Sequence, residues 1–412
     1  MIEGFKPWGN KTSLAIRLSA YLLLTFATSC AGTSLLREPV PEALVTRADV
    51  QDYSKIRFYS DDQSAMEELV QVRITETRTL YTGIPLKNRK VDIRFLSISG
   101  GGSDGAFGAG FLNGWTATGQ RPRFDVVTGV STGAMIAPMA YLGTDYDTKL
   151  KEAYTTISTE DVAKVQLLPA LLGQANSLSS NGPLQAMVAK YMTQSMLNEI
   201  ADEYRKGRML LIGTTNLDAQ RPVIWDIGAI AVSGRPDALA LTRQIILASA
   251  AIPEAFPPVQ IKVQVDGKVY DELHVDGGVT RQVFMYPPGY NPRVVDKALG
   301  WKAKRYAYII RNAKIDPQFK ITKAKLLPIS ARSIDTLIKS QGIGDLYRIY
   351  ATASRDGVDY NVAYIPSNFS VPSKSTFDRA YMNALYELGY SSASSGYKWH
   401  KSPPQLDVSE KR

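Results

Sequence analysis

Residues 91–115, VDIRFLSISGGGSDGAFGAGFLNGW, change in texture from an apolar strand pattern to a glycine-rich turn and then to an apolar helix pattern. A second unit of the same kind follows at residues 123–143, RFDVVTGVSTGAMIAPMAYLG. A short apolar run that enters a glycine turn and then a helix is typical of a buried parallel strand followed by its crossover helix. The two units predict an α/β protein in which chemistry is concentrated where strands end.

The remaining strand and helix patterns extend this prediction. Hairpins are expected at residues 208–228 and 256–279, one long helix at 183–207, another at 237–252, and two helices around 330–355. Residues 64–74 give the only good helix pattern before residue 91. Strands that alternate with helices predict a three-layer α/β/α fold with a mostly parallel central sheet.

The second glycine turn contains Gly129-Val130-Ser131-Thr132-Gly133, the G-x-S-x-G spacing that raises a serine hydroxyl on a sharp strand-to-helix turn. The first turn, GGGSDG at residues 100–105, has glycines that let successive backbone N–H groups converge on a developing oxyanion. We expect Asp104 to cap the helix that follows this turn.

A serine nucleophile requires a base, and the chain of 412 residues has only two histidines, His274 and His400. The segment HVDGG offers a carboxylate instead, because Asp276 ends a strand pattern and two glycines follow it. A carboxyl group that is shielded from water gains basicity and can accept the serine proton. His274 is expected to be a hydrogen-bonded histidine at the strand end, without a role in proton transfer.

The order GGGSDG, GVSTG and DGG resembles the patatin-like phospholipases, and the resemblance covers about residues 91–285. It implies a Ser-Asp dyad with Ser131 as nucleophile and Asp276 as base, an oxyanion loop formed by Gly100, Gly101 and Gly102, and hydrolysis of lipid esters without a cofactor or metal. Many members of this family carry an arginine where this chain has Asp104.

The first thirty residues resemble a bacterial lipoprotein signal, with a basic start, a short apolar run and the segment FATSCAG, which holds the only cysteine, Cys30. We therefore expect a signal segment over residues 1–30, lipid attachment at Cys30, and a location in the bacterial cell envelope. An N-terminal extension is expected over 31–90, the hydrolase domain over 91–390, and a frayed tail over 391–412.

The net charge of +9 favours contact with anionic membrane surfaces, whereas no basic run interleaved with aromatic residues indicates nucleic-acid binding. Two scattered histidines and one cysteine offer no metal-ligand cluster. Two alternatives stay open. One is a non-catalytic lipid-binding lipoprotein on the same fold. The other is a dinucleotide-binding oxidoreductase, since GGGSDG also fits G-x-G-x-x-G and Asp125 lies 20 residues further on.

Overall fold

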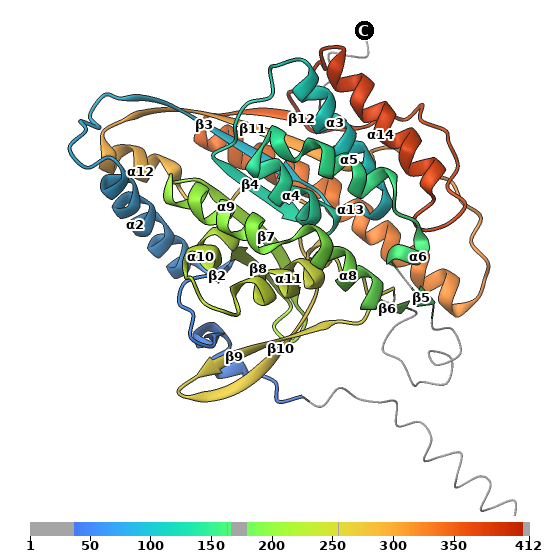
Figure 1. The fold of residues 1–412 in the computed structure, drawn as a ribbon, viewed down its shortest axis with the longest axis horizontal. Coiled ribbons are helices and arrows are strands. Elements are labelled where there is room, and N and C mark those ends of the chain that lie inside the picture. The colour runs from blue at the N-terminus through green and yellow to red at the C-terminus, as the bar shows by residue number, and fades with distance from the viewer. Residues whose placement is uncertain (1–36, 163, 166–178, 254, 407–412) are drawn as a thin grey trace, which may run out of the picture.

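The computed structural model describes residues 37–162, 164–165, 179–253 and 255–406. The signal segment and Cys30 lie outside this part of the chain. Within it, a ten-stranded sheet runs through the molecule in the order β1-β9-β10-β7-β4-β3-β11-β12, with β8 beside β7 and β2 beside β8 (Figure 1). The strands are β1 (Asp49–Val50), β2 (Arg57–Tyr59), β3 (Lys90–Ile98), β4 (Val126–Val130), β7 (Met209–Asn216), β8 (Arg221–Asp226), β9 (Val259–Val265), β10 (Lys268–Asp276), β11 (Lys302–Lys314) and β12 (Val358–Ile365).

The centre of this sheet is parallel, as the sequence predicted. Strands β7, β4, β3, β11 and β12 all run in one direction. The hairpins β7–β8 and β9–β10 add antiparallel strands, because each pair is joined by a short turn rather than by a crossover helix. The sheet is therefore mixed, with a parallel core and an antiparallel flank.

Helices cover both faces of the sheet. The side chains of β11 alternate between two hydrophobic clusters: Ile310 packs into the larger cluster, with helices such as α3 and α4, whereas Ala307 and Ile309 pack against Leu346 and Ile349 of α13. The helices are α2 (Gln63–Leu80), α3 (Gly105–Ala117), α4 (Thr132–Leu142), α5 (Asp147–Thr155), α6 (Thr159–Val162), α8 (Gly182–Tyr191), α9 (Gln194–Arg205), α10 (Ile227–Val232), α11 (Ala238–Ser249), α12 (Pro292–Leu299), α13 (Leu326–Asp356) and α14 (Arg379–Ser394). The three-layer prediction is confirmed.

Two helix predictions were wrong. The helix expected over 183–207 is two helices, α8 and α9, because the hydroxyl of Thr193 accepts a hydrogen bond from the amide of Met196 and starts a new helix. The two helices expected around 330–355 are one helix, α13. Its Gly342 lies against the guanidinium of Arg311, and a Cβ at that position would overlap Arg311 Nη1.

Both ends of the described chain contribute to the fold. In the expected extension, β1 pairs with β9, β2 pairs with β8, and the helix predicted at 64–74 is present as α2. The segment expected to be a frayed tail differs from the prediction. Its first residues belong to α14, which ends at Ser394. Beyond the helix, Trp399 packs against Trp115 of α3, and His400 pairs with Val362 of β12. The segment is held in place because its aromatic side chains complete an apolar cluster beside α3.

Candidate active site

Ser131 lies between the last residue of β4 and the first residue of α4, with φ 56° and ψ −125°. This positive φ is strained for a residue with a side chain, and strain of this kind is concentrated at functional sites. The glycines on either side permit the turn, since a Cβ at Gly129 would overlap the carbonyl of Gly133, and one at Gly133 would overlap the carbonyl of Ile98. The G-x-S-x-G spacing is thus explained by backbone contacts.

A second serine fixes this turn. The amide of Ser131 donates to Oγ of Ser249 at 3.0 Å, and Ser249 Oγ in turn donates to the carbonyl of Gly213 at 2.7 Å. Ser249 ends α11 and is fully buried. The sequence analysis placed Ser249 in the helix expected over 237–252 and gave it no role in the site.

Asp276 is the last residue of β10, and it is nearly fully buried. Register explains its place: β8 occupies one edge of β7, and on the other edge Val130 of β4 pairs with Gly213 while Asp276 of β10 pairs with the next residue, Thr214. The end of β10 therefore lies directly beyond the end of β4, where the Ser131 turn starts. A Cβ at Gly277 would overlap the Gly213 carbonyl, so the glycine after Asp276 permits this close approach.

The carboxyl group of Asp276 has one engaged oxygen and one open oxygen. Oδ1 accepts a hydrogen bond of 2.7 Å from the amide of Gly278, whereas Oδ2 has no well-formed hydrogen bond among the described residues. Burial raises the pKa of Asp276 to about 7, against the lowering effects of the Ser131 hydroxyl and the Gly278 amide. We conclude that the Ser131 hydroxyl is close to Asp276 but falls short of full hydrogen-bond geometry.

The glycine loop lies beside Ser131. A Cβ at Gly100 would stand 3.1 Å from Cβ of Ser131. The amide of Gly100 already donates to the carbonyl of Gln282 at 3.0 Å, so it is not free to bind an oxyanion. Gly101 and Gly102 have φ values of 157° and 56°, and in the described structure their amides donate no hydrogen bond to the backbone.

Asn312 of β11 fastens this loop at both ends. Its side-chain Nδ2 donates to the carbonyl of Ser99 at 2.9 Å, and its Oδ1 accepts from the amide of Gly108 at 3.0 Å. Its backbone amide donates to Oγ of Ser99 at 2.8 Å, and it is fully buried. A Cβ at Gly101 would overlap the Asn312 carbonyl. Sequence reasoning missed Asn312, since one asparagine in a strand pattern gives no signal.

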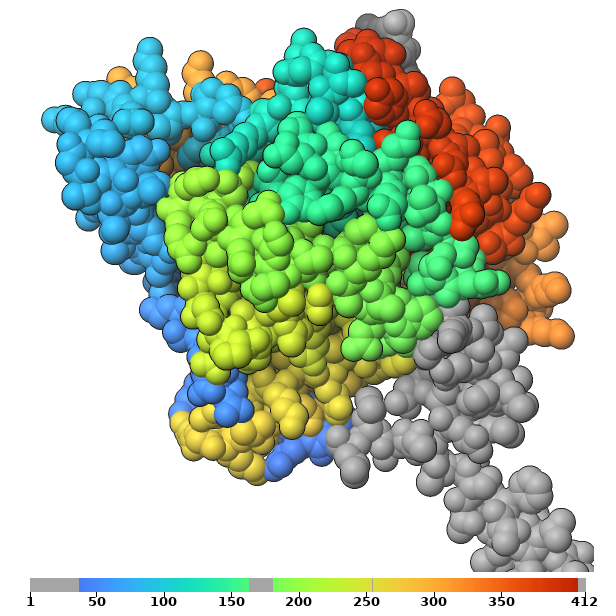
Figure 2. Space-filling view, viewed as in Figure 1, coloured from blue at the N-terminus to red at the C-terminus, as the bar shows by residue number. Residues whose placement is uncertain are grey.

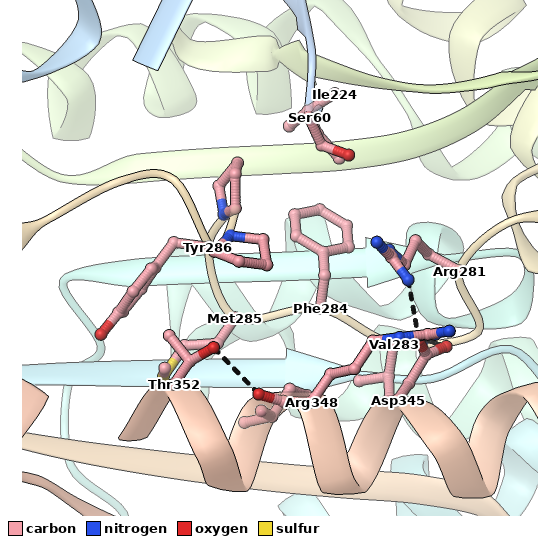
Figure 3. Close-up of a pocket in the computed structure, with 13 residues that line it drawn as sticks. Ser60, Ile224, Arg281, Val283, Phe284, Met285, Tyr286, Asp345, Arg348 and Thr352 are labelled. Atoms are coloured by element: carbon pink, nitrogen blue, oxygen red, sulfur yellow. Dashed lines mark hydrogen bonds and ion pairs between the residues drawn. The ribbon is translucent and has the colours of Figure 1, made fainter. Parts of the chain in front are cut away.

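The far side of the loop rests on α13 through Asp345. Its Oδ2 accepts a hydrogen bond of 2.7 Å from the amide of Gln282, the residue whose carbonyl binds Gly100. Figure 3 shows Asp345 with Arg281 and Arg348 in the cavity behind this contact, together with Phe284 and Met285. Neither Ser131 nor Asp276 lines that cavity, so it is distinct from the candidate active site.

The prediction that Asp104 caps α3 was wrong. Its side chain makes no capping hydrogen bond and instead accepts one of 2.7 Å from the hydroxyl of Tyr381 on α14. Burial raises the pKa of Asp104 to about 6, and the Tyr381 hydrogen bond opposes that rise.

The histidines are engaged elsewhere in the described structure. His274 is fully buried between Thr214, 2.9 Å from its Nδ1, and Glu272, 2.9 Å from its Nε2. Burial lowers its pKa, and Glu272 is in turn bound by Arg57 of β2 at 3.0 Å. His400 stacks on Tyr364. His274 is hydrogen-bonded at the strand end, as expected.

An apolar cavity of about 420 Å³, including its open mouth, begins at Ser131 and Gly102. Its walls are almost entirely hydrocarbon and aromatic, from Met135, Leu184, Met187, Ile252, Phe256 and Phe377. A cavity of this chemistry suits an acyl chain rather than a polar substrate. The described residues contain no group of His, Cys, Asp and Glu side chains that would hold a metal ion.

Three comparisons show which known proteins the chain resembles. The family model described as patatin-like phospholipase matches residues 96–286, a range that contains both glycine turns, Ser131 and Asp276. Among solved structures, VipD from Legionella pneumophila is similar at a TM-score of 0.36 and 12% identity, over 76% of this chain and 67% of that chain. A search of curated proteins gave no match.

The chain is thus similar to the patatin-like phospholipases over residues 96–286.

Proposed function

We propose that this protein is a lipid acyl hydrolase in which Ser131 is the nucleophile and Asp276 is the base. The observation that carries the proposal is the pairing of a strained serine turn with a buried carboxyl group whose Oδ2 has no other partner among the described residues. The pKa of about 7 keeps a large share of Asp276 ionised at neutral pH and leaves the group basic enough to accept a proton.

The reaction would proceed in two balanced steps. Ser131 Oγ attacks the ester carbonyl while its proton passes to Asp276; the bond to the leaving alcohol breaks, and Asp276 returns the proton to that alcohol. Water then attacks the acyl-serine, gives its proton to Asp276, and releases the carboxylic acid as the proton returns to Ser131. The dyad requires neither a cofactor nor a metal.

The oxyanion formed in each step needs backbone donors, and the amides of Gly101 and Gly102 are the best candidates. The amide of Gly100, which the family resemblance included, is bound to the Gln282 carbonyl and instead holds the loop in place. The acyl chain of the substrate would lie in the apolar cavity that starts at Ser131.

The test is covalent labelling. A fluorophosphonate probe is expected to label the protein at Ser131. In parallel assays without the probe, the protein is expected to release fatty acid from phospholipid. Labelling and hydrolysis should both disappear in Ser131→Ala, and hydrolysis should fall at least 1000-fold in Asp276→Asn. An unlabelled protein whose cavity still binds fatty acid would favour the non-catalytic lipid-binding alternative.

The dinucleotide-binding alternative has less support. Asp125, the acidic residue that it requires, accepts a hydrogen bond of 2.7 Å from the backbone amide of Arg94, and burial raises its pKa. An aspartate engaged in this way is not free to bind a ribose.

We also propose that lipid attached to Cys30 holds the domain at a membrane of the cell envelope. The apolar run and small residues before Cys30 support this proposal. Among the described residues, no helix is both long and apolar enough to cross a bilayer. Growth with a labelled fatty acid is expected to mark the wild-type chain and not Cys30→Ser, and the unmarked variant should leave the membrane fraction. Equal labelling of both chains would refute the anchor.

A further inference from the structure

Large apolar side chains are exposed together on one segment, which comprises the loop after β11 and the first half of α13. Phe319 is 93% exposed, Ile321 83% and Leu326 80%, and Leu337 on the next turns of the helix is 68% exposed. Side chains of this size are rarely left in water on neighbouring positions unless they meet a partner. We call residues 319–337 the apolar rim.

The apolar rim projects from the body of the domain. Every buried residue of α13 lies at or after Gly342, so the first half of the helix packs little against the sheet. Figure 1 shows this half, in orange, running out beyond the strands, and its atoms reach the right-hand margin of Figure 2. Contacts from the helix to the loop keep the rim ordered: Arg332 donates to the carbonyl of Gln318 at 2.5 Å.

The charge of the rim is positive. Lys320, Lys323 and Lys325 alternate with its apolar residues, are exposed, and form no ion pair within the part of the chain that the structure describes. Asp335 is the rim's only acidic residue, and Arg332 pairs with it at 2.7 Å. Free lysines beside exposed apolar side chains are complementary to a surface that has anionic headgroups above hydrocarbon.

The rim is also close to the candidate active site. Asp335 and Lys314 are near enough to Asp104 in the glycine loop for their charges to act on its pKa. Gln341, four residues beyond the rim, donates a hydrogen bond of 2.6 Å to the carbonyl of Thr280, shortly after Asp276. A surface that touched the rim would therefore lie near the mouth of the apolar cavity.

We propose that the apolar rim docks the folded domain on a phospholipid bilayer that carries anionic headgroups. Phe319, Ile321 and Leu326 enter the outer hydrocarbon, and the three lysines lie over headgroup phosphates. Docking in this way turns the Ser131 cavity toward the lipids. The role of docking rests on the proposed lipid hydrolysis, whereas the docking itself can be measured without it.

The experiment uses the full chain with Cys30→Ser and Ser131→Ala, so that neither a lipid anchor nor hydrolysis affects the result. Sedimentation with vesicles of phosphatidylcholine alone, and with 30% phosphatidylglycerol added, measures binding. We expect at least 10-fold tighter binding to the anionic vesicles, reduced by high salt. The triple variant Phe319→Ser/Ile321→Ser/Leu326→Ser should bind both kinds of vesicle at least 10-fold more weakly than the parent. The triple variant Lys320→Gln/Lys323→Gln/Lys325→Gln should bind at least 10-fold more weakly only to the anionic vesicles.

A matched control changes apolar residues that are exposed elsewhere: Ile84→Ser/Val269→Ser/Val294→Ser should bind like the parent. With Ser131 restored, the rim variants should hydrolyse a soluble short-chain ester at the parent rate but vesicle lipid at least 10-fold more slowly. If no ester is hydrolysed at all, the proposed function fails while the vesicle result still stands. Parent-like binding by the apolar rim variant would overturn the proposal, as would a parent dimer in light scattering that the variant converts to monomer.

Discussion

Asp104 and Tyr381 are 277 positions apart in the chain and are joined by a hydrogen bond of 2.7 Å. Asp104 lies in the glycine loop beside Ser131, where a negative charge would oppose an oxyanion. The hydroxyl of Tyr381 holds the carboxyl group toward α14 and away from the position where that charge develops.

The first prediction follows from this contact. Asp104→Asn keeps an acceptor for the Tyr381 hydroxyl and removes the charge, so kcat should change by less than about 3-fold. Because burial raises the pKa of Asp104 to about 6, its contribution to stability is complete below about pH 4 and is lost as pH rises to about 6, so the variant should gain stability over wild type across that range and keep a constant gain above it. A rise of 10-fold or more in kcat would mean that the carboxylate faces the oxyanion; ester hydrolysis and thermal unfolding at pH 5 and 8 measure the two effects.

The second prediction concerns pH. Asp276 acts as a base only when it is ionised, so kcat/KM should rise about tenfold per pH unit up to a midpoint near its pKa of about 7 and then level off. The stability effect has the opposite direction. A pKa that is raised in the folded state favours the protonated fold, so this contribution is complete below pH 4 and is lost as pH rises to 7. Asp276→Asn should lack that loss, which is about 4 kcal/mol at most.

Asp226 supplies the control for this pH test. Burial raises its pKa to about 7 as well, but its carboxylate caps α10 by accepting a 2.9 Å hydrogen bond from Ala229. Asp226→Asn should flatten the stability profile and leave the midpoint of the activity profile in place. If the midpoint moved in Asp226→Asn and stayed in an active Asp276 variant, Asp276 would not be the base.

The third prediction tests Asn312 as a positioning residue. Asn312→Asp keeps the acceptor for Gly108 but loses the donor to the Ser99 carbonyl, which should loosen the glycine loop. We expect kcat to fall about 10- to 100-fold with little change in KM, and stability to fall by about 1–3 kcal/mol. Enzyme kinetics and denaturant unfolding on one preparation measure the loss of kcat and the loss of folded protein separately. If kcat fell only in proportion to the folded fraction at the assay temperature, Asn312 would have a purely structural role.

The fourth prediction compares two glycines. Gly133→Ala should abolish folding or activity, because its Cβ would overlap the carbonyl of Ile98. Gly344→Ala, on α13, meets no atom within 4 Å and should leave activity unchanged and stability equal or up to about 1 kcal/mol higher. Circular dichroism and ester hydrolysis measure both. A fully active Gly133→Ala protein would contradict the geometry given for the Ser131 turn.

The parts of the site that the sequence predicted are those in which glycine is required locally. Ser131 and Asp276 could be predicted because the backbone at Gly129, Gly133 and Gly277 is too crowded for a side chain. The required glycines form a sequence motif that can be recognised without knowing the tertiary contacts. Their roles as nucleophile and base stay predictions until activity is measured.

The residues that sequence reasoning missed all act across the fold. Ser249, Asn312 and Tyr381 reach the site from α11, β11 and α14. Each is a common residue in an ordinary helix or strand pattern, so its importance depends on tertiary contacts that a single sequence does not display. The wrong helix prediction around residues 330–355 has the same cause. A glycine within a helix pattern suggests that the helix ends there, and only the folded structure shows that Gly342 makes room for the guanidinium of Arg311.

The pairing of His400 with Val362 has a consequence for handling the protein. β12 is the last strand along the main path of the sheet, and two backbone hydrogen bonds, of 2.9 and 3.2 Å, join it to the final described segment. Unpaired strand edges recruit the edges of other molecules and lead to aggregation. A shortened protein that ended after Ser394 would uncover this edge and remove Trp399 from its aromatic neighbours, so it would be a poor choice for crystallisation or assay.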